Sequence, residues 1–155
     1  MAKPRLKSIG IVNIDFGQNV TIVQPSNLYC CHIGTDCFIG PFVEIQQGVI
    51  IGRGTKIQSH AFVRELFTIG KDCVIAHRVM FINDLFQTGG PAKGDQTLWR
   101  PTQIGNWVAI GSNATILPVC ISDDVVIGAG AVLTQSIVQA GIYAGNPARL
   151  LRKLK

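Results

Sequence analysis

Histidines are the side chains of this sequence best suited to proton transfer or metal binding. His60 and His77 follow Ile57 and Ile75 at offsets of three and two, and those isoleucines are 18 residues apart. If the chain coils with that period, the two imidazoles should be diagonal neighbours near one corner. They could act as a general base or contact a substrate, or be ordinary surface or interface histidines. Zinc would need a third imidazole, and His32 has a different phase on a remote coil, so we expect no metal.

A second group of polar side chains begins where the periodic pattern of the sequence stops. Residues 83–102 start with Asn83-Asp84 and contain Trp99 and Arg100, but no histidine. A long irregular segment in a regular domain is usually functional, although a neutral insertion is the alternative. Asn83-Asp84 would also suit a simple turn. Trp99 and Arg100 could cover a substrate or brace a neighbouring subunit.

A six-residue repeat must position these side chains. Short strands joined by tight bends explain a period of six, which fits neither a lone helix nor an array of hairpins. Each repeat is too small to bury its apolar side chain alone, so stacked coils share one core. Three repeats make a coil of 18 residues, so Ile33, Ile51 and Ile69 should stack directly. The repeated apolar positions are Ile33, Ile39, Ile45, Ile51, Ile57, Val63, Ile69, Ile75 and Phe81.

The same spacing predicts how the domain begins and ends. It extends upstream through Phe16, Ile22 and Leu28, with a five-residue step to Ile33. It resumes at Ile104, and a shift by one residue within 117–120 predicts a tightened corner. A short basic helix, Arg149 to Leu154, is predicted to cap the open end.

Composition limits the class of protein. With 155 residues, 47% hydrophobic and 15% charged, the chain should form one domain, 1–155, with a real core. We expect a cytoplasmic protein without a membrane span, because no apolar run approaches the roughly 20 residues that a span needs and the N-terminus lacks a signal peptide. Five cysteines, of which Cys37, Cys73 and Cys120 fall inside apolar repeats, suggest buried thiols rather than disulfides.

The net charge of +5 comes largely from the chain ends. This distribution, without aromatic residues interleaved, argues against nucleic-acid binding. The terminal charges could simply be solvated, or the C-terminal cluster could meet a phosphate-bearing ligand. Half of the 14 basic residues are Lys3, Arg5, Lys7, Arg149, Arg152, Lys153 and Lys155.

Several stretches of the chain resemble the left-handed β-helix acyltransferases. They are the hexad pattern, the interrupting loop, and residues 110–118, 127–132 and 144–149. More narrowly, residues 38–46 and Met80-Phe81-Ile82-Asn83-Asp84 resemble the bacterial N-acetyltransferases of nucleotide-linked 3-amino sugars. The resemblance implies a left-handed parallel β-helix of hexapeptide repeats and a homotrimer with intersubunit active sites. Acetyl-CoA would lie between neighbouring helices, with the sugar under the projecting loop.

The resemblance also implies roles for individual residues. The pantetheine arm of acetyl-CoA would run along Ala109, Gly111 and Ala129, and Arg149 and Lys153 would pair with nucleotide phosphates. His60, His77, Trp99 and Arg100 are candidate substrate contacts, and Asn83 and Asp84 the candidate catalytic pair.

The missing loop histidine bears on the acceptor. Related sugar O-acetyltransferases carry a histidine where the loop leaves the coil, because a hydroxyl needs a strong base. An amine is partly neutral at about pH 7 to 8, so positioning and a weak proton acceptor suffice. We therefore predict that Asn83 orients an amine and that Asp84 holds it or accepts its proton. The expected acceptor is a dTDP- or UDP-linked amino sugar, most simply a 3-amino-dideoxyhexose, for surface polysaccharide such as O-antigen. The alternatives are a sugar O-acetyltransferase and a non-catalytic or metal-binding trimeric β-helix.

Overall fold

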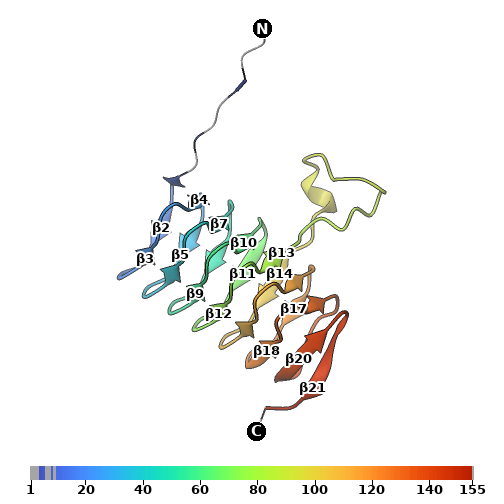
Figure 1. Ribbon diagram of the computed structural model, residues 1–155. Coiled ribbons are helices and arrows are strands. Elements are labelled where there is room, and N and C mark those ends of the chain that lie inside the picture. The colour runs from blue at the N-terminus through green and yellow to red at the C-terminus, as the bar shows by residue number, and fades with distance from the viewer. Residues whose placement is uncertain (1–3, 6–7, 9, 155) are drawn as a thin grey trace.

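The chain winds into a solenoid of short parallel strands, with one loop projecting from its side (Figure 1). The computed structural model describes residues 4–5, 8 and 10–154. Successive turns place one strand in each of three sheets, which run side by side along the solenoid. These are the parallel β-helix coils that the hexapeptide pattern predicts, in the left-handed form that the resemblance to the acyltransferases implies.

The three sheets, named A, B and C here, contain strands three apart in the chain, except that β20 and β21 follow β18 at the end of sheet C. Sheet A consists of β1 (Ile11–Val12), β4 (Asn27–Tyr29), β7 (Glu44–Ile45), β10 (Phe62–Val63), β13 (Met80–Phe81), β16 (Thr115–Ile116) and β19 (Val132–Leu133). Sheet B consists of β2 (Asp15–Phe16), β5 (His32–Ile33), β8 (Ile50–Ile51), β11 (Phe67–Ile69), β14 (Thr102–Ile104) and β17 (Cys120–Ile121). Sheet C consists of β3 (Thr21–Ile22), β6 (Phe38–Ile39), β9 (Lys56–Ile57), β12 (Val74–Ile75), β15 (Ala109–Ile110), β18 (Val125–Ile127), β20 (Gly141–Gly145) and β21 (Ala148–Arg152).

The second residue of most strands points into the core. Ile33 pairs with Ile51 and Ile51 with Ile69, which confirms the predicted stacking. All three are at most 1% exposed. The predicted five-residue steps keep this register, because Ile104 pairs with Ile121 across the shortened coil. One column of aliphatic side chains therefore runs through the solenoid.

Glycine is required where neighbouring coils meet at a bend. A Cβ on Gly52 would lie 2.6 Å from the carbonyl carbon and oxygen of Gly70 in the next coil. No side chain fits at that separation, which explains the glycine that follows the repeated isoleucine.

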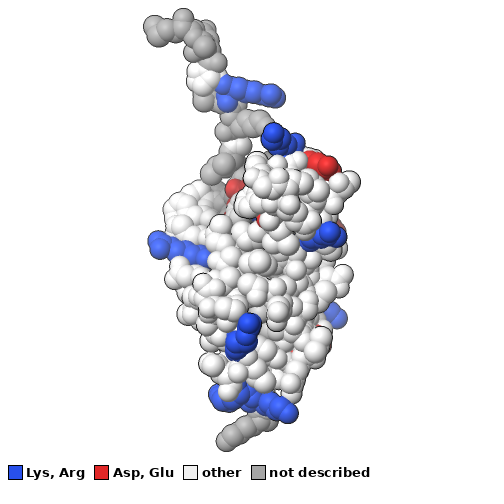
Figure 2. Space-filling model, turned by 90° about the vertical axis from the view of Figure 1, so that its right-hand side faces the viewer, with Lys and Arg blue, Asp and Glu red and all other residues white. Residues whose placement is uncertain are grey.

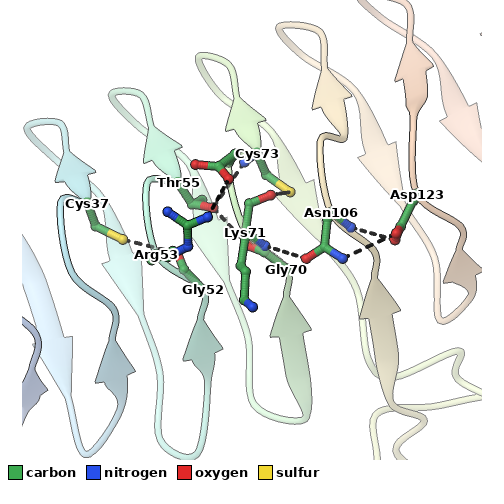
Figure 3. Close-up of polar contacts among 10 residues, drawn as sticks. Cys37, Gly52, Arg53, Thr55, Gly70, Lys71, Cys73, Asn106 and Asp123 are labelled. Atoms are coloured by element: carbon green, nitrogen blue, oxygen red, sulfur yellow. Dashed lines mark hydrogen bonds and ion pairs between the residues drawn. The ribbon is translucent and has the colours of Figure 1, made fainter.

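A ladder of side-chain hydrogen bonds runs inside the corner between sheets B and C (Figure 3). Thr55 Oγ1 donates to the carbonyl of Gly70 (2.8 Å) and accepts from the amide of Cys73 (3.1 Å). Cys37 Sγ donates to the carbonyl of Gly52, and Cys73 Sγ to that of Gly105, both at 3.2 Å. Each side chain thus satisfies a glycine carbonyl of the next coil, where the tight bend leaves it without another partner.

Replacing Thr55 by valine should destabilise the solenoid. The shape is kept, but a buried carbonyl and a buried amide lose their partner, so the free energy of unfolding should fall by about 1–3 kcal/mol. Urea denaturation measures this against Thr68→Val, in an exposed position of β11, for which we expect a change under about 0.5 kcal/mol. Equal values for the two variants would show that the ladder contributes nothing.

The projecting loop interrupts the solenoid between β13 and β14. It occupies residues 82–101, because Thr102 already pairs with Phe67 in sheet B. Its one described helical element is a short 3-10 helix, η1 (Gln96–Leu98), capped by Asp95, which accepts from the Thr97 amide at 3.0 Å. These bounds differ by one residue at each end from the expected 83–102.

The predicted C-terminal helix is wrong. Residues Arg149 to Arg152 lie in β21, which pairs antiparallel with β20 across the turn at Asn146-Pro147. Strand β20 itself adds to β18 in sheet C. The hairpin continues the sheet, so the backbone groups at its edge are satisfied by strand pairing instead of being covered by a helix.

The expectation of buried thiols holds for three of the five cysteines. Cys31, Cys37 and Cys73 are buried, and burial raises the pKa of the Cys31 thiol to about 11. Cys30 and Cys120 are exposed, the latter because it occupies the outward position of β17. All five are free.

Candidate functional site

Asn83 lies where the loop leaves the solenoid, at the corner between sheets A and B. Its side chain is fully buried, and Nδ2 donates to the carbonyl of Glu65 in the preceding coil at 3.3 Å. The amide of Arg100 donates to the Asn83 carbonyl at 2.9 Å, which brings the two ends of the loop together. Asn83 thus ties the loop to the coil beneath it.

Asp84 fastens the loop to itself. Its carboxylate accepts from the amide of Phe86 (2.9 Å) and from that of Ala92 (2.8 Å), and its backbone bridges Trp99. These two N–H groups, helped by the charge of Arg64, hold the pKa of Asp84 below its ordinary value. The carboxylate therefore stays ionised and is a weak base. Each oxygen accepts one bond and retains a lone pair for another donor.

Arg64 and Glu65 complete this corner and were not predicted from the sequence. The Arg64 guanidinium lies 5.8 Å from the centroid of the Trp99 ring and 6.0 Å from that of Phe62. Gln96 Nε2 donates to Glu65 Oε2 at 3.4 Å. The sequence did contain a signal for Glu65, because this residue precedes Asn83 by 18 residues, which is one full coil. Trp99 therefore covers an arginine of its own chain.

The two histidines lie on a different edge, at the turns between sheets C and A. His77 Nδ1 is 2.8 Å from Ser59 Oγ, and the His60 ring stacks on Phe42 with centroids 4.8 Å apart. The backbone of Arg78 donates to Ser59 and so keeps the two turns in adjacent coils. This placement agrees with the predicted diagonal relation near a corner. His32 lies on sheet B, 2.7 Å from Asp15.

Two of the predicted acetyl-CoA contacts lie on the same edge as His60 and His77, which is called the histidine edge here. The Asn113 amide donates to the His77 carbonyl, and that of Gly130 to the Ser112 carbonyl, so Gly111 and Ala129 follow His77 up this edge. Ala129 is exposed. Ala109 is half-buried in β15 on sheet C, while Arg149 and Lys153 belong to the C-terminal segment. The corner formed by Arg64, Glu65, Asn83, Asp84 and Trp99 is called the loop base here. Within one chain, sheet A separates it from the histidine edge.

Charge is spread thinly over the side of the molecule that carries the loop. Figure 2 shows well-separated Lys and Arg side chains from one end to the other, with few acidic ones among them. No described helix is long and apolar enough to cross a membrane. In the part of the chain that the structure describes, no three His, Cys, Asp or Glu side chains are grouped so that they could hold a metal ion.

Comparisons with known proteins place the repeats among those of bacterial transferases. Residues 30–65 match the family model described as "Bacterial transferase hexapeptide (six repeats)", and residues 101–135 match "Hexapeptide repeat of succinyl-transferase". The two matches flank the loop.

Curated proteins are similar to the chain in sequence, and a solved structure is similar to it in fold. Over 152 residues the chain is 28% identical to the bifunctional protein GlmU of Thermotoga petrophila, covering 92% of this chain but only 34% of that longer protein. It is 33% identical to the galactoside O-acetyltransferase of Escherichia coli, covering 79% and 63%. A solved structure of a single-residue mutant of AntD, an N-acyltransferase from Bacillus cereus in complex with dTDP and coenzyme A, superposes with a TM-score of 0.71. Its identity is 21%, over 91% of this chain and 84% of that one.

Proposed function

We propose that the protein is an acetyl-CoA-dependent N-acetyltransferase that acetylates the amino group of a dTDP- or UDP-linked sugar. A 3-amino-dideoxyhexose destined for surface polysaccharide is the simplest acceptor. The observation that carries the proposal is the loop base: it offers Asn83 and Asp84, while residues 83–102 contain no histidine. The described imidazoles lie elsewhere on the same chain, those of His60 and His77 at the turns between sheets C and A and that of His32 on sheet B.

An amine needs less from the enzyme than a hydroxyl does. Its neutral fraction can attack the thioester directly once it is held in position. Asp84, being ionised and a weak base, is better suited to hold an ammonium group than to remove a proton from a hydroxyl. Asn83 Oδ1 is buried and has no partner among the described residues, and we assign it to accept a hydrogen bond from the amine.

The separation of the two edges favours a site between subunits. In a cyclic homotrimer, the loop of one subunit would lie over the histidine edge of its neighbour. That neighbour would contribute His60, His77, Gly111 and Ala129, and acetyl-CoA would run along the small residues. The AntD structure, a solenoid of the same fold in complex with dTDP and coenzyme A, supports this choice of ligands.

Thiol release from acetyl-CoA tests the proposal. Nucleotide-linked 3-amino and 4-amino sugars are supplied as acceptors beside their hydroxyl parents. Release with an amino sugar, and a product whose acetyl group resists mild alkali as an amide does, would support it. The absence of release with every amino sugar would contradict it. Reaction of the hydroxyl parents alone would favour an O-acetyltransferase, the activity named for the Escherichia coli relative.

A bulky side chain on the histidine edge should block acetyl-CoA. Ala129 is exposed at a turn, so Ala129→Phe fills space beside Gly111 without entering the core. We expect the dissociation constant for coenzyme A, measured by calorimetry, to rise about tenfold or more through lost contact. Gln135→Phe, at an exposed turn of the same coil, is the matched control and should bind normally. Unchanged binding in both variants would move the cofactor away from this edge.

A further inference from the structure

Three buried polar atoms at the loop base have no hydrogen-bond partner among the described residues. They are Arg64 Nε, Trp99 Nε1 and Asn83 Oδ1. Leaving such groups unpaired is costly, so a cluster of them in one place requires an explanation. Two are donors and one is an acceptor, which defines the chemistry of the missing partner.

The charge of Arg64 is also unpaired. The ion pairs found in the described part of the chain are His32 with Asp15 and Arg53 with Asp72, so no described carboxylate lies within 4.0 Å of Arg64. The guanidinium lies instead near two aromatic rings, 5.8 Å from the centroid of Trp99 and 6.0 Å from that of Phe62. Arg64 as a whole is half-buried. An arginine oriented in this way presents a preformed fork to an anion.

The surrounding carboxylates restrict which ligand fits. Burial raises the pKa of Tyr29, and the charges of Glu44 and Glu65 raise it further. The charge of Arg64 contributes to the lowered pKa of Asp84, so these groups share one neighbourhood. Their negative charge disfavours an anion placed anywhere except on Arg64, and it favours a cationic amine nearby. A ligand that carries an anionic oxygen group and an amine, separated by a sugar, would satisfy both.

We propose that Arg64, covered by Trp99, is the subsite for the diphosphate of the nucleotide-linked acceptor, and that Asn83 Oδ1 accepts a hydrogen bond from the sugar of that acceptor. The assignment rests on the proposed function. The fork of Arg64 binds the phosphate oxygens from the open side. Trp99 supplies a ring that fixes the guanidinium, and its indole N–H is a further donor. Specificity for a nucleotide-linked sugar over a free sugar then resides in Arg64.

Calorimetric titration with UDP, dTDP, coenzyme A and inorganic phosphate tests this subsite. Arg64→Gln should weaken binding of UDP or dTDP about tenfold or more, since a charged hydrogen bond is lost. The affinity of Arg64→Lys for UDP or dTDP should lie between those of Arg64→Gln and wild type, because lysine keeps the charge but lacks the guanidinium fork. Trp99→Phe keeps an aromatic ring but removes the indole N–H, and it should weaken binding of UDP or dTDP about threefold. Arg53→Gln removes an exposed arginine paired with Asp72 at 3.7 Å and is the control, with no expected change.

The outcomes separate this inference from the proposed function. Wild-type nucleotide affinity in Arg64→Gln would overturn the subsite, even if the wild-type protein acetylates amino sugars. A selective loss of coenzyme A affinity would also overturn it, because Arg64 would then serve the donor. Loss of UDP or dTDP affinity, with coenzyme A affinity and melting temperature preserved, supports it. That result would stand even if acetyl transfer to amino sugars failed.

Discussion

Replacing Asp84 by alanine should lower kcat/KM for the amino-sugar acceptor about 100-fold or more, because both positioning and charge are lost. The amides of Phe86 and Ala92 lose their shared acceptor, so the loop is no longer held over its base. The solenoid core does not involve this carboxylate, and its melting temperature should change little. Hydrogen exchange of residues 85–99, measured with acetyl transfer, should show lost protection in step with lost rate.

Asp95→Ala is the matched control within the same loop. Asp95 accepts from the Thr97 amide and hydroxyl, and so affects only the cap of η1. We expect local exchange to rise there without a comparable loss of rate. Full activity and unchanged protection in Asp84→Ala would refute the assigned role of Asp84.

The direction of the pKa shift of Asp84 predicts how protection of the loop from hydrogen exchange depends on pH. Its pKa is lowered in the folded chain, so the stabilisation is complete above the ordinary carboxyl value of about 4. It is lost as the pH falls through the folded value. Protection of residues 85–99 should therefore be constant from neutral pH down to about 4 and decline below that.

Asn83→Ala is expected to reduce kcat/KM by about 100-fold as well, for a different reason. The variant removes the atom proposed to orient the amine and also the bond from Nδ2 to the Glu65 carbonyl. Some loss of stability is therefore expected together with the loss of rate, and the two effects need to be separated.

Asn106→Ala provides that separation. Asn106 also joins adjacent coils, in a half-buried position at the corner between sheets B and C, where its Oδ1 accepts from the Lys71 amide at 2.9 Å and its Nδ2 donates to Asp123 at 3.2 Å (Figure 3). We expect a fall in melting temperature with nearly normal kcat/KM. If Asn83→Ala retains wild-type turnover, or if both variants lose rate equally, Asn83 has no special role in the reaction.

The scaffold was predictable because its signal is periodic. Each coil buries the same position, so Ile33, Ile51 and Ile69 reveal their stacking through spacing alone. The end of the solenoid has no such repeat, and the short basic segment after Asn146-Pro147 reads as a helix although it pairs as β21. Single-element propensity was overridden there by an available sheet edge.

The candidate site was predictable only in part. The break in the period located Asn83 and Asp84, but it could not show that both oxygens of Asp84 bind backbone amides. Arg64 occupies an outward position of a regular coil, where almost any side chain is tolerated. Its importance appears only once the loop folds back and places Trp99 over it.

The central claim is that the acceptor atom is an amine nitrogen. The most direct measurement compares kcat/KM for a nucleotide-linked 3-amino sugar with that for the same compound carrying a hydroxyl at the same carbon. With no imidazole at the loop base, we expect the amine to be favoured by about 100-fold or more, since the hydroxyl would need a general base. Equal rates, or a faster hydroxyl acceptor, would contradict the account.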